Sequence, residues 1–389
     1  MSADLRIEGT CDPHFAAVRE AFAQSFSRFG ETGAAVAVML DGRSVVDLWA
    51  GYTDAARTRP WDRDTIVNVY STTKGMAAVC AHRLVDQGRL DLDAPVATYW
   101  PEFAAGGKAR LPVRYLLSHQ AGLPAVRESL PASAMYEWET MTAALAAQEP
   151  WWEPGTKHGY HAVTYGWLVG EVIRRVSGKS VGTFFRNEVA RPLGVDFHIG
   201  LAAEHDARTA PLIPAPPPTA EQMNLFVEML KNRDAESMLL NVMFNPPILP
   251  DAVNTREWRA AEIPAANGHT NARALARVYG VLACGGVLDG VRVLSPESIE
   301  RALAMQAEGP DAVLPLYTRF GLGFMLSTPQ EKMGPNPRTF GHGGMGGSMA
   351  FADPDARLGF GYVMNEAHMG LWLIDPRAAA LIDAVYAAL

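Results

Sequence analysis

Ser71 and Lys74 are the two residues of this chain whose types and spacing most clearly could do chemistry. They lie three positions apart in Ser71-Thr72-Thr73-Lys74, where an apolar helix is expected to begin. Positions i and i+3 share one face of a helix, so the hydroxyl and the amine can come within hydrogen-bonding distance. An adjacent base activates a serine. The tetrapeptide therefore indicates a nucleophile and its base, although it also fits a helix N-cap followed by a solvated lysine.

The composition narrows the function classes. With 389 residues, 48% of them hydrophobic and 20% charged, the chain is long enough for two packed domains. Its net charge of -8, without a run of lysine or arginine, argues against a nucleic-acid partner. Cys11, Cys80 and Cys284 are too far apart for a metal or redox motif and indicate no disulfide framework. No membrane-spanning stretch or secretion signal is recognisable, so we expect a cytoplasmic protein.

The elements that must position Ser71 follow from hydrophobic periodicity. Helical patterns cover 13–30, 71–87 and 376–389, a hairpin turns at Asp41-Gly42 between 34–40 and 43–50, and extended runs cover 65–70, 320–326, 348–352 and 358–364. The stretch 91–298 is mostly helical, with surface loops or a lid at 211–218 and 245–250. We therefore predict an α/β domain made of 1–80 and 310–389, interrupted by a mainly helical domain over 81–309, with the active site between them.

Five segments together carry a resemblance to a known family. They are V-Y-S-T-T-K-G (69–75), L-D-L-D-A-P-V (90–96), L-L-S-H-Q-A-G-L-P (116–124), P-G-T-K-H-G-Y-H-A-V-T-Y-G (154–166) and G-H-G-G-M-G-G-S (341–348). In these the chain resembles the serine hydrolases with the class C β-lactamase fold, and within them the family VIII carboxylesterases. The resemblance implies a β-lactamase/transpeptidase-like fold of the α/β (α+β) class, with an antiparallel sheet flanked by helices.

The resemblance also assigns roles to residues. Ser71 takes the place of the family nucleophile, Lys74 that of its partner, and Tyr160 that of the Tyr-x-Asn tyrosine. Either Lys74 or Tyr160 can be the immediate base, because a buried amine and a phenol can exchange one proton. The helix start supplies the Ser71 amide to an oxyanion, and the family geometry implies the Met345 amide as the second donor.

The substrate side departs from the family pattern at two positions. His342-Gly343-Gly344 stands where the family has Lys-Thr-Gly, so a fixed positive charge is exchanged for a mostly neutral imidazole. Gly343 and Gly344 allow a strand edge to pass close to a substrate. After Tyr160 come His161 and Ala162, so the asparagine that holds a substrate amide is missing. Both departures favour esters over β-lactams.

An apolar substrate cleft is expected beside Tyr160. Some of its wall is expected from Trp152 and from other aromatic and methionine residues in or near the helical region, namely Trp151, Phe226, Met229, Met238, Met243 and Phe244.

Two other motifs are interpreted as structural. Gly178-Lys179-Ser180-Val181-Gly182 satisfies G-x-S-x-G, but it follows a helical pattern rather than a strand, so Ser180 is predicted to cap the next helix. His158 and His161 have a spacing that could bind metal but lack a carboxylate cluster, so no metal is predicted. His119 and His269 are expected to hold turns by hydrogen bonds.

The sequence thus predicts a serine carboxylesterase that hydrolyses short-chain or aromatic carboxylic esters through an acyl-enzyme, without a cofactor. Its expected partner is a small-molecule ester, with no nucleic acid or membrane, and the oligomeric state is left open. The alternatives are an acyltransferase, a β-lactamase or amidase on the same fold, and a catalytically inactive scaffold.

Overall fold

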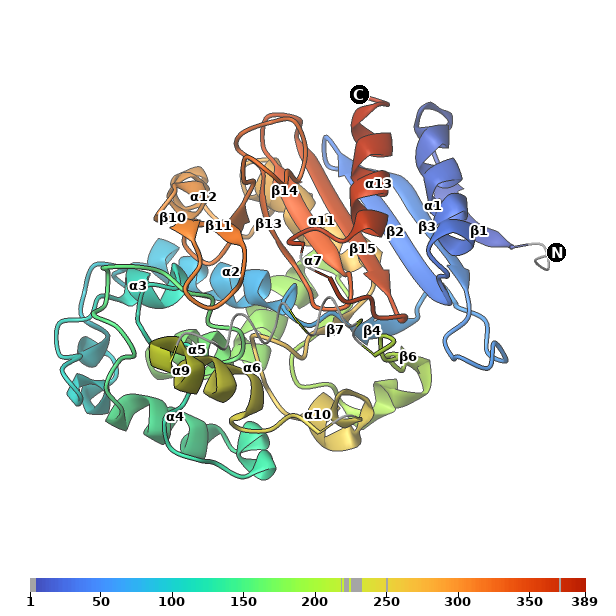
Figure 1. The fold of residues 1–389 in the computed structure, drawn as a ribbon. Coiled ribbons are helices and arrows are strands. Elements are labelled where there is room, and N and C mark those ends of the chain that lie inside the picture. The colour runs from blue at the N-terminus through green and yellow to red at the C-terminus, as the bar shows by residue number, and fades with distance from the viewer. Residues whose placement is uncertain (1–4, 218, 220–223, 225–232, 250, 371) are drawn as a thin grey trace.

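A nine-stranded antiparallel sheet forms one side of the molecule (Figure 1). The computed structural model describes residues 5–217, 219, 224, 233–249, 251–370 and 372–389. The strand order is β1-β3-β2-β15-β14-β13-β12-β11-β10. The strands are β1 (Ile7–Cys11), β2 (Gly33–Leu40), β3 (Arg43–Gly51), β10 (Ala307–Pro310), β11 (Tyr317–Phe320), β12 (Met325–Leu326), β13 (Phe340–Gly343), β14 (Met349–Asp353) and β15 (Leu358–Met364).

The two ends of the chain meet at the middle of this sheet. β2 pairs with β15 along its length, so the predicted association of N-terminal and C-terminal strands is confirmed. The predicted hairpin is also confirmed, since β2 and β3 pair across Asp41 and Gly42, which both have positive φ. Such angles match the right-handed twist of a two-residue hairpin.

Helices cover both faces of the sheet. α1 (Ala16–Arg28) and α13 (Pro376–Tyr386) lie in front of it, and α11 (Ala272–Ala283) lies behind (Figure 1). α11 sits directly on β15, because a Cβ at Gly359 would overlap the backbone of Gly280. Glycine in a strand commonly marks such a close approach. This sheet-packed helix falls inside the stretch 81–309, and the domain limits at 80 and 310 stay a prediction.

The helical region lies against the end of the sheet that carries β10 to β13. The buried helix α2 passes between β13 and helices α5 and α6 (Figure 1). The other α-helices of the described residues are α2 (Thr73–Asp86), α3 (Val113–Leu117), α4 (Trp138–Ala147), α5 (Thr164–Ser177), α6 (Val181–Phe185), α7 (Arg191–Leu193), α9 (Arg233–Phe244), α10 (Arg256–Ala260) and α12 (Pro296–Leu303). Among the described residues, no helix is long and apolar enough to cross a membrane.

A small second sheet braces the start of α2. Its order is β5-β7-β4-β6, built from β4 (Ile66–Asn68), β5 (Phe197–His198), β6 (Thr209–Ala210) and β7 (His269–Thr270). A further hairpin joins β8 (Val287–Leu288) to β9 (Val291–Arg292). The predicted extended run before Ser71 is thus confirmed as β4, and the predicted buried helix after it as α2.

One predicted strand was wrong. The run 320–326 is not continuous, because β11 ends at Phe320 and β12 begins at Met325, and the two strands pair with each other. Gly321 and Gly323 lie in the connecting turn, and Gly323 has φ +92. Glycine adopts such an angle without the strain that other residues have, which allows a tight turn at this point of the chain.

Candidate active site

Ser71 lies in a tight turn between β4 and α2. The preceding residue, Tyr70, has φ +41, which is uncommon for a residue with a side chain. The turn is fixed by its neighbours, because the Val69 amide donates to Gly268 O (2.9 Å) and the Gly268 amide donates to Thr73 Oγ1 (2.8 Å). Strain of this kind persists only where the surrounding structure holds it. The segment around Gly268 therefore supports the backbone of Ser71.

Lys74 is completely buried and faces Ser71. Its Nζ lies 3.1 Å from Ser71 Oγ and donates to the carbonyl oxygens of Ala162 (2.6 Å) and Ala265 (3.0 Å). Burial lowers the pKa of Lys74 well below its ordinary value, because the ammonium form loses its hydration. The i and i+3 proximity predicted for Ser71 and Lys74 is confirmed.

Tyr160 completes a group of three side chains. The Lys74 Nζ lies 4.8 Å from the centroid of the Tyr160 ring, and the Ser71 side chain lies beside the Tyr160 phenol. Tyr160 is 8% exposed, and burial raises the pKa of its hydroxyl, although the neighbouring Ser71 side chain lowers it. The site thus brings together a buried amine with a lowered pKa and a phenol with a raised one, both next to the Ser71 hydroxyl.

Asp311 holds the backbone of Tyr160, a role that the sequence did not reveal. Its Oδ1 accepts hydrogen bonds from the amides of Tyr160 (2.9 Å), Val313 (2.8 Å) and Leu314 (2.9 Å). Its Oδ2 accepts from Thr318 Oγ1 (2.9 Å), which also lies 2.9 Å from His158 Nε2. Asp311 therefore ties the segment that carries Tyr160 to the connection between β10 and β11.

His161 and His119 are structural neighbours of Tyr160. The Nδ1 of His161 donates to Gly159 O (2.7 Å), and its Nε2 accepts from the Leu123 amide (3.0 Å). His119 Nδ1 accepts from the His161 amide (3.1 Å), and its ring lies 5.0 Å from that of Tyr160. Burial lowers the pKa of His161 to about 3, so its imidazole is neutral. Both ring nitrogens of His161 are therefore used within the protein.

His342 lies on β13 beside Tyr160, with the two ring centroids 6.0 Å apart. Its Nδ1 donates to Gly343 O (2.6 Å), because a carbonyl oxygen can only accept. Burial and the neighbouring Lys74 lower the pKa of His342 to about 3. The position of the family lysine thus holds a neutral ring whose Nε2 has no hydrogen-bond partner among the described residues.

The loop 344–347 follows β13 and lies against the segment before Ser71. A Cβ at Gly344 would overlap Val69 O, and Ser348 Oγ donates to the same Val69 oxygen (2.8 Å). Within the described residues, neither the Ser71 amide nor the Met345 amide donates to a protein acceptor. The Ser71 and Met345 amides are therefore free among the described residues. The approach of Gly343 and Gly344 to a substrate stays a prediction.

An apolar cluster surrounds Tyr160. Trp152 is 8% exposed, donates from Nε1 to Lys157 O (3.1 Å), and packs in this cluster with Met238, while Trp151 packs at its edge. The other buried members are Leu239, Val313, Phe320 and Met325. Met243 and Phe244 are 48% and 56% exposed and are not among the buried members of this cluster. Phe226 and Met229 lie outside the described residues.

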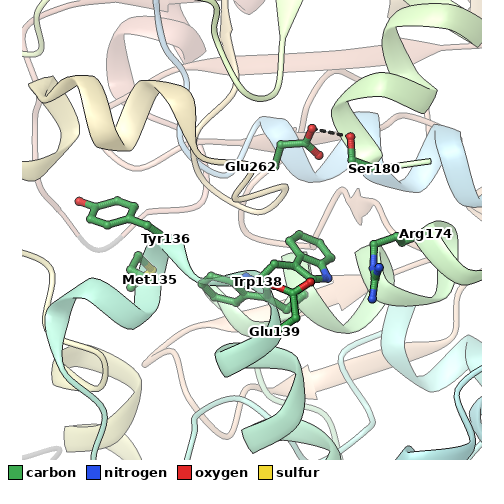
Figure 2. Close-up of a pocket in the computed structure, with 8 residues that line it drawn as sticks. Met135, Tyr136, Trp138, Glu139, Arg174, Ser180 and Glu262 are labelled. Atoms are coloured by element: carbon green, nitrogen blue, oxygen red, sulfur yellow. Dashed lines mark hydrogen bonds between the residues drawn. The ribbon is translucent and has the colours of Figure 1, made fainter. Parts of the chain in front are cut away.

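The G-x-S-x-G motif lies elsewhere, at a separate cavity of about 280 Å³ lined by Met135, Tyr136, Trp138, Glu139, Trp167, Arg174, Ser180 and Glu262 (Figure 2). Ser180 caps α6 by accepting from the Thr183 amide (3.3 Å), as predicted. Its hydroxyl donates to Glu262 Oε1 (2.6 Å), whose pKa burial raises. Within the described part of the chain, no group of three metal-ligating side chains could hold an ion.

Comparisons with known proteins show the family to which the chain belongs. A family model described as Beta-lactamase matches residues 21–384. The chain is 40% identical over 378 residues to "Esterase/beta-lactamase LipL" of Mycobacterium tuberculosis (strain ATCC 25618 / H37Rv), covering 96% of this chain and 86% of the relative.

Two solved structures cover almost the whole chain. The crystal structure of a family VIII carboxylesterase has a TM-score of 0.91 and 45% identity, covering 99% of this chain and 100% of that one. A penicillin-binding protein homologue from Caulobacter crescentus has a TM-score of 0.89 and 41% identity, with the same coverage. The β-lactamase/transpeptidase-like fold expected from the resemblance is confirmed, and the chain belongs to the beta-lactamase family.

Proposed function

We propose that this protein is a serine carboxylesterase that hydrolyses short-chain or aromatic esters through an acyl-enzyme on Ser71. The observation that carries the proposal is the contact of the Ser71 hydroxyl with both Lys74 and Tyr160 in a buried setting. A nucleophile, a base and a proton carrier within reach of one another are what acyl transfer requires. The relatives named as esterases support the same reaction.

Lys74 is the immediate base in this mechanism. The carbonyl oxygens of Ala162 and Ala265 take the two N–H bonds of a neutral amine, which leaves its lone pair for the Ser71 hydroxyl. Its lowered pKa favours that neutral form. Lys74 takes the Ser71 proton as Oγ bonds to the ester carbonyl carbon.

Tyr160 is the proton donor. Its raised pKa keeps the phenol protonated, so it can donate to the leaving alkoxide as the carbon–oxygen bond breaks. Lys74 then passes the proton that it took from Ser71 to the Tyr160 phenolate, which restores the phenol. The amides of Ser71 and Met345 stabilise the negative oxygen of the tetrahedral intermediate. Water repeats the same steps on the acyl-enzyme and releases the acid, without a cofactor.

The substrate side supports esters rather than β-lactams. His161 is fully used in structural hydrogen bonds, and Ala162 offers no side-chain amide to hold a lactam or peptide. His342 is neutral, so it offers no fixed positive charge to a substrate carboxylate. The apolar cluster around Trp152 suits a small acyl or aromatic group. The expected partner is thus a small-molecule ester, and the cytoplasmic location stays a prediction.

The test compares hydrolysis of p-nitrophenyl butyrate and nitrocefin by the purified protein, with Ser71→Ala as the blank. We expect fast ester turnover, slow or absent lactam turnover, and loss of both in the variant. A fluorophosphonate should label the peptide that contains Ser71. Preferential nitrocefin turnover would favour a β-lactamase, an ester product formed with an added alcohol would favour an acyltransferase, and absence of both labelling and turnover would favour a scaffold.

A further inference from the structure

Arg377 is a completely buried cation that touches the loop carrying the Met345 amide. Its Nη2 donates to Gly346 O (2.6 Å) and its Nη1 donates to Glu366 O (2.9 Å). A buried guanidinium has five N–H donors that need acceptors, and a backbone carbonyl of this loop accepts from one of them. The contact joins the start of α13 to the edge of the site.

The guanidinium is itself held in a fixed orientation. Its Nε and Nη2 donate to the two oxygens of Asp375 (2.9 and 3.0 Å), and Nη1 lies 3.4 Å from Glu31 Oε2. Glu31 also accepts from the Tyr362 hydroxyl. Although burial disfavours the charged form, Tyr362, Asp375 and Glu31 raise the pKa of Arg377, so it stays charged. Because the guanidinium is planar and its other N–H groups are already bound, it can fix the position of the backbone carbonyl that accepts from it.

The loop 344–347 is a turn whose geometry fixes the direction of the Met345 N–H. The Gly347 amide donates to Gly344 O (3.0 Å), and Gly346 has φ +88, which suits the third position of a type II turn. Because a trans peptide is planar, the Met345 N–H points opposite to Gly344 C=O and therefore out of the turn.

The turn is anchored at Gly346 from two sides. Gly346 O accepts from Arg377 Nη2 and also from the His368 amide (3.0 Å). The guanidinium packs so closely that a Cβ at Gly347 would overlap Arg377 Nη2. The position of the turn relative to Ser71 therefore depends on the guanidinium as well as on the bond between Gly344 N and Ser348 O (2.7 Å).

We infer that Arg377, held by Asp375 and Glu31, is a positioning residue of the oxyanion hole that fixes the Met345 amide through Gly346. This inference rests on the proposed function, because it assumes that the Met345 amide meets a developing oxyanion. Arg377 touches neither the nucleophile nor the substrate in this role. It acts by keeping one donor in place before the reaction begins.

The experiment compares an aryl butyrate with the matching aryl thionobutyrate, in which C=S replaces C=O. Sulfur is larger and accepts hydrogen bonds more weakly, so a well-positioned oxyanion hole favours the oxygen ester. The ratio of kcat/KM for the two substrates therefore reports on the oxyanion hole. Loss of stability alone lowers both rates together and leaves this ratio unchanged.

Arg377→Lys is the main variant, because it keeps a positive charge beside Asp375 and Glu31 but cannot make the forked contacts. We expect the ratio of oxygen ester to thionoester to fall about 10-fold or more, a part of the 100- to 1000-fold effect of removing an oxyanion donor. Asp375→Asn, which keeps the side-chain size and weakens the hold on the guanidinium, is expected to lower the ratio by a smaller factor.

Lys108→Met is the matched control. Lys108 is also completely buried and donates to the backbone carbonyls of Ala105 (2.7 Å), Ala146 (3.0 Å) and Gln148, far along the chain from the loop 344–347. We expect this variant to be less stable with an unchanged ratio. An unchanged ratio in Arg377→Lys and Asp375→Asn, or an equal fall in Lys108→Met, would overturn the inference alone, whereas ester hydrolysis that survives Ser71→Ala would overturn the proposed function and with it the inference.

Discussion

Ser71 and Ser180 lie in two regions that look alike at first. Each serine precedes a helix, and each hydroxyl contacts an ionisable side chain whose pKa is shifted by burial. Ser71 contacts Lys74 at the start of α2. Ser180 contacts Glu262 at the cavity drawn in Figure 2. Each also belongs to a motif that is associated with serine hydrolases, S-x-x-K for Ser71 and G-x-S-x-G for Ser180.

The difference lies in which hydrogen-bonding groups remain free. Ser180 Oγ caps α6, and the Glu262 carboxylate accepts from both Ser180 and the Gly182 amide (2.8 Å). Ser71 caps no helix through its side chain, its own amide is unused among the described residues, and Lys74 and Tyr160 both reach its hydroxyl. A reactive serine therefore needs a base and an amide that the local fold leaves free, more than it needs a motif.

The largest expected effect comes from breaking the proton relay at Ser71. Lys74→Ala removes the base and Tyr160→Phe removes the proton donor, so each should lower kcat for p-nitrophenyl butyrate by at least about 1000-fold. Because the two groups act on the same proton, the double variant should be little worse than either single one. Steady-state kinetics on the three variants measures this coupling.

Lys179→Ala is the matched control, since Lys179 is exposed and precedes Ser180. It should leave kcat unchanged. Mild losses that simply multiply in the double variant would show that Lys74 and Tyr160 act independently, which contradicts the relay.

The motif at Ser71 was predictable because its geometry is local. The proximity of Ser71 and Lys74 needs only the helical period, and Ser180 as a helix cap needs only the preceding helix. Tyr160 required the resemblance, because a tyrosine 86 residues after Lys74 carries no local signal. Asp311 and Arg377 could not be predicted, because they act through backbone groups that come close only in the folded chain.

The fold was predictable to a similar degree. Alternating and helical periods located β2, β3, α2, β14, β15 and α13, and the pairing of the two chain ends followed from where the strands fell. The turn between β11 and β12 was missed although Gly321 and Gly323 could have indicated it. The packing of α11 on the sheet depends on contacts with Gly359 and Gly361, which no periodicity within α11 reveals.

The pH dependence of ester hydrolysis tests the role of Lys74 at Ser71, with a smaller expected effect on the rate. Lys74 must be neutral to accept the Ser71 proton, so kcat/KM should fall about tenfold per pH unit once the pH drops below its pKa. Because burial lowers that pKa, this fall should lie well below pH 10.5. Tyr160 has a raised pKa, so no fall from its ionisation is expected up to pH 10.

The measurement is kcat/KM for ester hydrolysis as a function of pH, in the natural chain and in the control variant His342→Asn. The acid limb should persist in the variant, because burial lowers the pKa of His342 to about 3, so ionisation of His342 does not produce a limb above that pH. A limb that disappears with His342, or a midpoint near 10.5, would mean that Lys74 is not the base.

The smallest kinetic effect is expected at Ser180, where a substitution should change the stability of the fold and not the rate of ester hydrolysis. Ser180→Ala removes the cap of α6 and the hydroxyl that donates to Glu262, so it should cost about 1 kcal/mol of unfolding free energy and leave ester turnover unchanged. Ser180→Thr keeps a hydroxyl that can cap and should be close to the natural chain. Denaturant unfolding measures the stability of both variants, and ester kinetics measures their turnover. A loss of turnover near that of Ser71→Ala would make Ser180 part of the reaction, because among the described residues no hydrogen bond joins Ser180 to Ser71, Lys74 or Tyr160.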